Sequence, residues 1–461
     1  MDTFDVVIVG GGPATRIFNK YLHFFRPEIR TVVIRDEERI VNHCGTPYIL
    51  EGKIEWERGL ISEDLVTRFG TPIVVDPVVG GSPEEKYVEC ASGRKIGYGT
   101  LVFATGTDQV LPPIPGIDLP GVLKVRRTED LTASMKFLEP VEKVVVLGGG
   151  YIGLEFAQAL RHLGKEVALV ELESHVMGGR IDGAMAEALE EELRKMGVEL
   201  FLGRKAARVR GKERVEALEL EDGGVLSCGA LLAAVGVKPM VDYAPAFGLE
   251  TTPQGIVVDE YFFTGVENIY AMGDCVQTFS RVTGRPVPGK LGSNAGQMAR
   301  RLALNLSGRK APFPGVTNVA VTRVGELAYG SAGLTEEDAG REGISILVTR
   351  NKSTDIYDNM PGNRPVEAKL VFREEDLLLL GGELLHPGNP AGFLEALGQM
   401  VERRATLEEV ITMSYSSHPE LTPKTSKPFF VWAAEPLFKK LASSGAFQGE
   451  ADSERPVASG R

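Results

Sequence analysis

Residues 143–171 read KVVVLGGGYIGLEFAQALRHLGKEVALVE. The apolar run at 143–147 and the run at 166–170 are typical of buried strands, and a helix lies between them. Gly148, Gly150 and Gly153 have the spacing of a dinucleotide-binding turn. There the first glycine makes the turn, the second lets the backbone approach a pyrophosphate, and the third permits close helix–strand packing. The pattern predicts a strand–turn–helix–strand unit with parallel strands, in which the helix ends near residue 163. Apolar residues near helical spacing predict a further helix at 182–196.

Glu171 ends the second strand of this unit. A carboxylate at that place can accept hydrogen bonds from a ribose 2′-hydroxyl, while the helix N-terminus offers N–H groups to phosphates. The alternative, a glycine-rich packing turn, is weakened because strand, helix and terminal acid occur together. Glu173 follows, and residues 172–177 contain no arginine. We therefore expect NADH to be preferred over NADPH.

The N-terminus repeats this pattern imperfectly. A strand at residues 5–9 leads into Gly10 and Gly12, and a helix runs to residue 25. Thr15 stands where the third glycine is expected. The helix and strand must therefore lie further apart, or the threonine must fill a gap. A degenerate, empty nucleotide site is the alternative.

The strand that follows ends in a base instead of an acid. Arg35 holds the position where a ribose-binding carboxylate is expected, and Asp36 and Glu37 come next. Either acid could serve, with Arg35 turned to a phosphate or stacked on adenine.

Composition limits the class of protein. The chain has 461 residues, 43% of them hydrophobic, and a formal net charge of −12. This length suggests about three domains. The acidic balance argues against nucleic acid and against anionic membranes. Neither a signal peptide nor a membrane-length apolar run is visible, so we expect a cytoplasmic protein.

The four cysteines lie far apart and form no CxxC pair. Neither a disulfide framework nor a cysteine-based zinc site is indicated, and we expect no metal.

Three further segments have the character of strands that end at a ligand. They are LVFATG at residues 101–106, LLAAVG at 231–236 and NIYAMGD at 268–274. Asp274, delivered after a glycine, can hold a ribityl hydroxyl of a flavin. From about residue 316 the pattern changes to an α+β module. We expect strands at 366–372 and 377–385 there, and helices at 392–403 and 407–412.

Taken in order, GGGPA, LVFATG, GGGYIGLE, LLAAVG, NIYAMGD and the α+β module resemble the pyridine nucleotide–disulfide oxidoreductases over roughly residues 1–445. The resemblance implies an α/β fold with two Rossmann-like domains, which bind FAD and NAD, and a C-terminal α+β dimerisation domain. The implied boundaries are 1–115 and 245–315 for FAD, 116–244 for NAD and 316–447 for dimerisation. Residues 448–461 are polar and lack periodicity, so we expect a disordered tail there.

The resemblance also implies the residues that contact the two cofactors. The expected FAD contacts are Gly10, Gly12, Pro13, Ala14, Arg35, Asp36, Glu37, His43, Ala104, Thr105, Gly106, Gly273, Asp274, Asn294 and Ala295. The expected NAD contacts are Gly148, Gly150, Tyr151, Ile152, Gly153, Glu171 and Gly236.

The sequence around Cys44 indicates which group within this family the chain resembles. Cys44 lies in HCGTPY, residues 43–48, with no second cysteine four or five residues away. This single-cysteine pattern is similar to the coenzyme A-disulfide reductase, NADH oxidase and persulfide reductase group, in which the cysteine faces the flavin. A flavin and a helix beginning near Pro47 are expected to lower the pKa of the thiol. The structural alternative is a small buried cysteine, which we prefer for Cys90, Cys228 and Cys275.

The C-terminal module departs from the group's pattern. Residues 359–362, NMPG, lack a tyrosine pair, and residues 414–419 read SYSSHP. Tyr415 and His418 are the candidate catalytic residues there, reaching the partner's flavin in a C2 homodimer. His418 is either a proton donor or a loop histidine. The acid expected five residues later is replaced by Pro423, for which Glu420 could substitute.

The sequence thus predicts an FAD-dependent NADH:disulfide or persulfide oxidoreductase that acts on a small thiol such as coenzyme A. One alternative is an NADH oxidase that reduces O₂ at the flavin, although residues 13–16, PATR, lack the histidine of the peroxidase and oxidase branch. The alternative of another class is a flavin-bearing electron-transfer partner of another protein.

Overall fold

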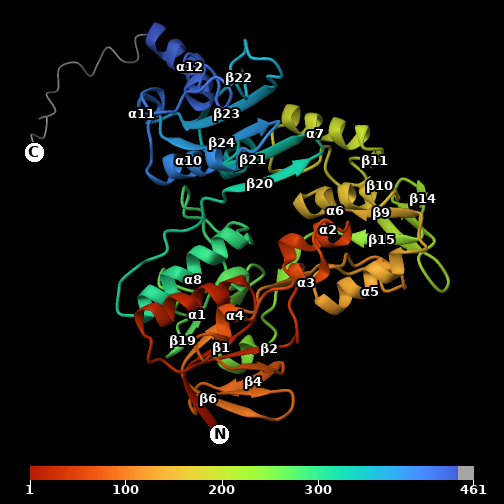
Figure 1. Cartoon of the computed structure of the whole chain (residues 1–461), viewed down its shortest axis with the longest axis vertical. Helices are drawn as coiled ribbons and strands as arrows, with labels where there is room; N and C mark the ends of the chain where they lie inside the picture. The colour runs from red at the N-terminus through yellow and green to blue at the C-terminus, as the bar shows by residue number, and fades with distance from the viewer. Residues whose placement is uncertain (445–461) are drawn as a thin grey trace, which may run out of the picture. The chain divides into compact units, whose positions relative to one another are not determined.

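The computed structural model describes residues 1–444, and the predicted disordered tail at 448–461 lies outside them. The chain forms two compact units (Figure 1). Of the described residues, the first contains 1–178 and 186–318, and the second contains 179–185 and 319–444. Each unit has its own sheets and core.

The first unit begins with a seven-stranded sheet in the order β3-β2-β1-β6-β5-β4, with β19 paired to β6. Strands β1, β2, β3, β6 and β19 run parallel, and β4 and β5 are antiparallel. Helices α1 and α8 pack against each other and share the core of this sheet (Figure 1). The elements are β1 Asp2–Val9, α1 Pro13–Phe25, β2 Thr31–Arg35, β3 Ile73–Val75, β4 Val78–Ser82, β5 Tyr87–Cys90, β6 Lys95–Phe103, β19 Ile269–Ala271 and α8 Gly292–Leu306.

Short helices and turns connect these elements around the predicted FAD site. They are η1 His43–Gly45, α2 Thr46–Leu50, α3 Trp56–Gly59, α4 Asp64–Thr67, η2 Ala244–Phe247, η3 Gly273–Cys275 and the hairpin β17 Thr251–Thr252 with β18 Gly255–Ile256.

The second sheet of this unit is built by residues 143–171 and their neighbours. Its five strands are parallel, in the order β11-β10-β9-β15-β8. The helix predicted at 182–196 is present as α7. A small antiparallel sheet, β12 to β14, was not foreseen. The elements are β8 Val122–Leu123, α5 Thr128–Leu138, β9 Lys143–Leu147, α6 Tyr151–His162, β10 Glu166–Val170, α7 Gly183–Lys195, β11 Val198–Phe201, β12 Ala206–Arg210, β13 Ala217–Leu220, β14 Val225–Ser227 and β15 Ala230–Ala233.

Two short strands join the two sheets at the ends of their equivalent motifs. Strand β7, Thr107–Gln109, directly follows LVFATG, and β16, Val237–Pro239, directly follows LLAAVG. The two pair antiparallel, Thr107 with Pro239 and Gln109 with Val237. The chain therefore crosses between the sheets beside both predicted cofactor turns.

The second unit is an antiparallel sheet in the order β20-β21-β24-β23-β22 with helices against it. The predicted strands and helices are present as β23, β24, α10 and α11, shifted by one or two residues at their ends. The elements are β20 Ala320–Val324, β21 Leu327–Gly333, α9 Glu336–Glu342, β22 Ile346–Thr354, β23 Pro365–Arg373, β24 Leu379–His386, α10 Ala391–Glu402, α11 Leu407–Ile411 and α12 Phe429–Ser443.

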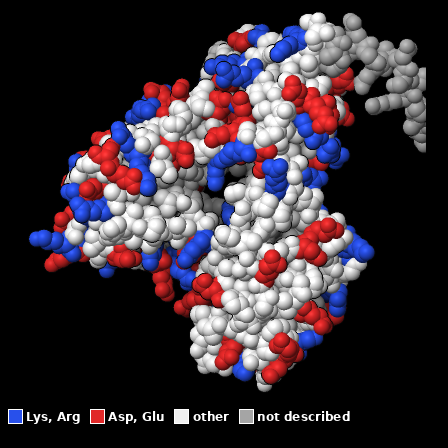
Figure 2. All heavy atoms as spheres, turned by 180° about the vertical axis from the view of Figure 1, so that it is seen from behind, with Lys and Arg blue, Asp and Glu red and all other residues white. Residues whose placement is uncertain are grey.

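Basic and acidic side chains are interspersed over the face drawn in Figure 2. None of the helices within residues 1–444 combines the length and the apolar character that a membrane crossing requires.

Candidate functional site

The two glycine turns are built in the same way. Gly10 has φ +117° and Gly148 has φ +107°, a region that side chains rarely adopt. A Cβ atom at Gly10 would collide with the carbonyl of Ala104, and one at Gly148 with the carbonyl of Ala234. LVFATG and LLAAVG therefore lie against the first glycine of their turns. The structure thus brings GGGPA together with LVFATG, and GGGYIGLE together with LLAAVG.

The third positions of the turns differ. A Cβ at Gly153 would collide with the carbonyl oxygen of Gly148, so only glycine fits. In the N-terminal copy the Thr15 hydroxyl donates a hydrogen bond to the Gly10 carbonyl, at 2.7 Å. Thr15 therefore fills the gap between helix and strand, which is the second of the two arrangements that the sequence allowed.

The helices after both turns begin with open ends. Gly12 and Gly150 are the N-caps of α1 and α6, and neither helix has a side-chain cap. The first N–H groups of a helix lack partners inside the helix and are suited to phosphate oxygens. Both turns can therefore receive a pyrophosphate, as the sequence predicts.

Asp274 lies where the two helices of the first sheet begin. Gly273 has φ +78°, and a Cβ there would lie 3.3 Å from the Ala14 Cβ and 3.7 Å from the Ala295 Cβ. Burial raises the pKa of Asp274, while the charges of Arg126 and Lys290 oppose that rise. A half-buried carboxylate beside two helix ends is placed to accept hydrogen bonds from a ligand hydroxyl.

Some predicted contacts have structural partners. The Asn294 amide donates to the carbonyl of Gly289 at 3.1 Å and to the Asn318 side chain at 2.9 Å. The Thr105 hydroxyl donates to the Met240 carbonyl at 2.7 Å. These two side chains hold loops of the site in place.

Cys44 is the one exposed cysteine among residues 1–444. It lies in η1, directly before Gly45, the N-cap of α2. The Thr46 hydroxyl donates to the His43 carbonyl at 2.8 Å and fixes this bend. The helix predicted near Pro47 is thus present, although it has only five residues.

The charge environment of Cys44 differs from the expectation. Burial raises the pKa of the thiol, and the carboxylates of Glu155 and Asp274 raise it further, while Arg126 lowers it. The residue is exposed, yet the protein around the sulfur removes part of its hydration. In the protein alone, desolvation and two carboxylates raise the pKa of the thiol by more than one guanidinium and a short helix lower it.

Arg126 connects Cys44 to its neighbours and was not foreseen. Its Nη2 donates to His43 Nδ1 at 3.2 Å and to the Thr107 hydroxyl at 2.9 Å. Burial, followed by the charge of Arg126, lowers the pKa of His43 to about 4. His43 is therefore neutral at physiological pH, and its proton lies on Nε2 because Nδ1 is the acceptor.

In the second sheet, Glu171 reaches back to its glycine turn. One carboxylate oxygen accepts the Gly149 N–H, and the other accepts the Glu173 N–H at 2.9 Å. Tyr151 and Ile152 begin α6, and Ile152 is exposed. Glu171 thus lies at the turn, where a nucleotide ribose would approach.

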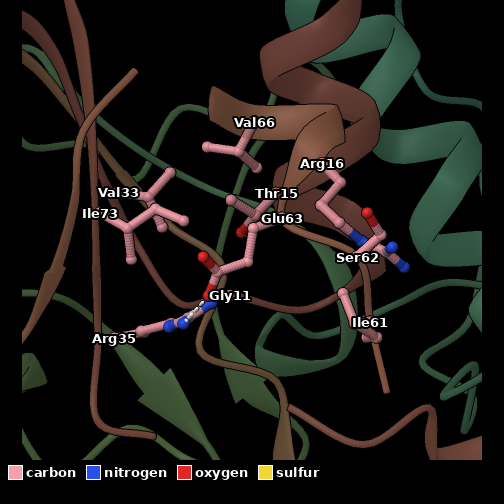
Figure 3. A pocket seen from close by; sticks show the side chains of 10 residues that line it. All are labelled: Gly11, Thr15, Arg16, Val33, Arg35, Ile61, Ser62, Glu63, Val66 and Ile73. Atoms are coloured by element: carbon pink, nitrogen blue, oxygen red, sulfur yellow. Dashed lines mark hydrogen bonds and ion pairs between the residues drawn. The ribbon is translucent and has the colours of Figure 1, made fainter. Parts of the chain in front are cut away.

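The end of β2 is arranged differently (Figure 3). Arg35 forms an ion pair with Glu63, which precedes α4. Asp36 forms an ion pair with Arg127 at 2.6 Å. Glu37 accepts the Thr128 N–H at 2.8 Å.

The candidate residues of the second unit lie in an exposed loop. The Tyr415 hydroxyl donates to the Thr425 carbonyl at 2.8 Å. His418 Nδ1 accepts a hydrogen bond from the backbone N–H of Glu420 at 3.3 Å. The backbone of Glu420, and not the carboxylate considered in the sequence analysis, forms this hydrogen bond with the ring. This leaves the Nε2 proton of a neutral His418 available as a donor.

Arg126 and Glu63 belong to no motif, and Glu155, the last residue of GGGYIGLE, was not expected to act on Cys44. Arg126 follows β8, Glu155 lies one turn into α6, and Glu63 lies in a connecting loop. Arg126 and Glu155 come together with Cys44 only through the tertiary fold. The sequence contains no spacing that would have selected them.

The residues fit an FAD molecule. The Nε atoms of Arg16 and Arg35 are buried and have no hydrogen-bond partner. Unpaired buried donors are costly, and phosphate or ribose oxygens would satisfy them. Together with the open end of α1 and the half-buried Asp274, they suit the ADP half and the ribityl chain of the cofactor.

Comparison with known proteins gives concordant matches. The pyridine nucleotide-disulphide oxidoreductase model matches residues 4–299, and the dimerisation-domain model of that family matches residues 319–427. An NADH oxidase of Methanocaldococcus jannaschii is 31% identical over 95% of this chain and 99% of its own length. A CoA-dependent NAD(P)H sulfur oxidoreductase of Pyrococcus furiosus is 32% identical over 83% of this chain and 88% of its own.

Among solved structures, an NAD-dependent persulfide reductase of A. fulgidus superposes with a TM-score of 0.89 at 25% identity. The match covers 95% of this chain and 84% of that one.

Proposed function

Because the chain belongs to the pyridine nucleotide-disulphide oxidoreductase family, we propose that it reduces a small disulfide or persulfide, such as one of coenzyme A, at Cys44. The chain is an FAD-dependent NAD(P)H oxidoreductase. The observation that carries the proposal is the placement of Cys44: the residue is exposed, precedes the N-terminus of α2, and lies among Arg126, Glu155 and Asp274.

The sulfur chemistry balances on Cys44 itself. The Cys44 thiolate attacks one sulfur of the disulfide, forms a mixed disulfide and releases the other half as a thiolate. Two electrons and a proton then restore the Cys44 thiolate and release the second thiol. Bound FAD supplies the relay of those two electrons from NAD(P)H.

The chain's own groups serve this exchange in separate ways. Arg126 favours the charged form of Cys44 and fixes the neutral tautomer of His43. Glu171 favours a nicotinamide cofactor with a free ribose 2′-hydroxyl, and hence NADH. His418, whose Nε2 proton is free to donate, is proposed to protonate the leaving thiolate from the partner subunit's loop. The match of residues 319–427 to the dimerisation-domain model supports a homodimer.

Stopped-flow spectroscopy tests the proposal. The flavin is reduced with NADH and then mixed with coenzyme A disulfide, coenzyme A persulfide or O₂. We expect Cys44→Ser to keep FAD and its reduction by NADH but to lose nearly all reoxidation by the sulfur compounds. Cys90→Ser, which changes a buried cysteine, is the matched control. If Cys44→Ser turns over the sulfur compounds at close to the parent rate, the mechanism is wrong.

A second candidate function is an NADH oxidase. The M. jannaschii relative of that name covers nearly the whole chain and favours it. Fast reoxidation by O₂ with slow reoxidation by every sulfur compound would favour the oxidase. Slow reoxidation by all of these acceptors would favour the electron-transfer alternative.

A further inference from the structure

The pocket beside the N-terminal glycine turn contains an unexpected pair of charges (Figure 3). It lies between Gly11 in the turn, Thr15 and Arg16 on α1, Arg35 at the end of β2, and Glu63 before α4. In a dinucleotide-binding fold this is where the adenosine ribose is held by a strand-end acid. Here the strand ends in a base.

Arg35 cannot do what that acid does. A guanidinium has five N–H donors and no acceptor, so it cannot accept a hydrogen bond from a ribose hydroxyl. Its side chain is only 6% exposed, and its Nη2 donates to the Glu38 carbonyl and to the Glu63 carboxylate. Arg35 is thus a buried support that holds a carboxylate from another segment.

The two acids that follow Arg35 have other partners. Asp36 pairs with Arg127 at 2.6 Å, and Glu37 accepts the backbone N–H of Thr128 at 2.8 Å. Both partners stand at the beginning of α5 and not in the pocket. Glu63 is the only carboxylate among the residues that line the pocket, within the described part of the chain.

The geometry of Glu63 suits a ligand on its free side. One carboxylate oxygen meets Arg35, and the side chain remains 46% exposed. Figure 3 shows the carboxylate directed toward the Gly11 turn. The buried Nε atoms of Arg16 and Arg35 have no partner. The pocket therefore offers an acceptor for hydroxyls together with donors for phosphate or ribose oxygens.

We propose that Glu63, held in place by Arg35, replaces the strand-end acid and accepts the hydroxyl hydrogen bonds of the FAD adenosine ribose. Glu63 is the binding residue, and Arg35 is a positioning residue that acts through it. The inference concerns how the cofactor is held and is independent of which acceptor the enzyme reduces.

Equilibrium binding of flavin to the full-length apoprotein, followed by flavin fluorescence, tests this. The probes are FAD and an FAD analogue whose adenosine ribose lacks its 2′ and 3′ hydroxyls. The parent protein should bind FAD about tenfold more tightly than the analogue, which is the effect of a hydrogen bond to a charged group. Glu63→Ala should weaken FAD about tenfold and leave the analogue unchanged. Unchanged binding of the analogue also shows that the variant is folded.

Arg35→Met should also reduce the discrimination between the two probes, because Glu63 loses its support, and in the Glu63→Ala background it should change that discrimination no further. Glu57→Ala is the matched control, since Glu57 is an exposed acid paired with Arg39 outside the pocket. If Glu63→Ala keeps the parent's discrimination between the two probes, or weakens both equally, the proposal is overturned. Loss of discrimination in Asp36→Asn or Glu37→Gln would assign the ribose to those acids and overturn it too.

Discussion

Glu171 should set the choice between the two nicotinamide cofactors, and Glu171→Gln tests this with a minimal change. One of its carboxylate oxygens accepts the Gly149 N–H and the other accepts the Glu173 N–H. The amide can keep one of these bonds while it removes the charge. Arg204, whose backbone N–H donates to the Glu171 carbonyl, has its side chain paired with Asp222. A 2′-phosphate would therefore meet uncompensated negative charge.

The magnitude follows from Coulomb's law. Two like charges about 4 Å apart repel by about 1 kcal/mol in water and about 4 kcal/mol at an effective dielectric of 20. Because Glu171 is partly exposed, about 2 kcal/mol is a reasonable middle value. This corresponds to about 30-fold in kcat/KM. The parent enzyme should prefer NADH by about this factor, and the preference should shrink as ionic strength rises.

Steady-state kinetics with both cofactors measures the effect. Glu171→Gln should raise kcat/KM for NADPH about tenfold or more and lower it for NADH by no more than about fivefold, the effect of one weakened hydrogen bond. Glu166→Gln is the matched control, since it removes the same charge at the opposite end of β10, where Glu166 pairs with Lys143. Equal kcat/KM for the two cofactors in the parent enzyme would refute the reasoning, as would an equal response to both substitutions.

Lys369 is 2% exposed and pairs with Asp182, Glu336 and the fully buried Glu383, so Lys369→Met should lower the free energy of unfolding by about 3–5 kcal/mol in urea denaturation. Lys352 is exposed and pairs with Glu367, so Lys352→Met should lower the free energy of unfolding by less than about 1 kcal/mol. Equal losses in the two variants would contradict this account. Since the Glu155 carboxylate raises the pKa of the Cys44 thiol, Glu155→Gln should increase the thiolate fraction and speed alkylation of the apoprotein by iodoacetamide at pH 7.5. The rate should rise with pH in both proteins, and an unchanged rate in the variant would show that this carboxylate does not act on the sulfur. Light scattering at micromolar concentration should give about twice the chain mass of 49.9 kDa, and a monomer would remove the basis for a site shared through His418.

Much of the fold could be predicted because local patterns carry it. The glycine turns, the helices that follow them and the parallel strands are written in contiguous residues, and α1, α6 and α7 lie within a residue or two of their predicted bounds. Other elements were not predicted. The sheet of β12, β13 and β14 and helix α12 lack a strong motif, and short strands depend on partners that are distant in sequence.

The sequence by itself determined the family and the order of the two nucleotide-binding units, and it selected Cys44 for the proposed chemistry, because each rests on residues adjacent along the chain. Only the tertiary structure decided that Thr15 fills its gap by bonding the Gly10 carbonyl, that Arg126 reaches His43, and that Arg35 pairs with Glu63. These contacts join groups up to 83 residues apart, and their strength depends on burial. A linear pattern contains neither the distance between two such groups nor the water that folding removes from between them.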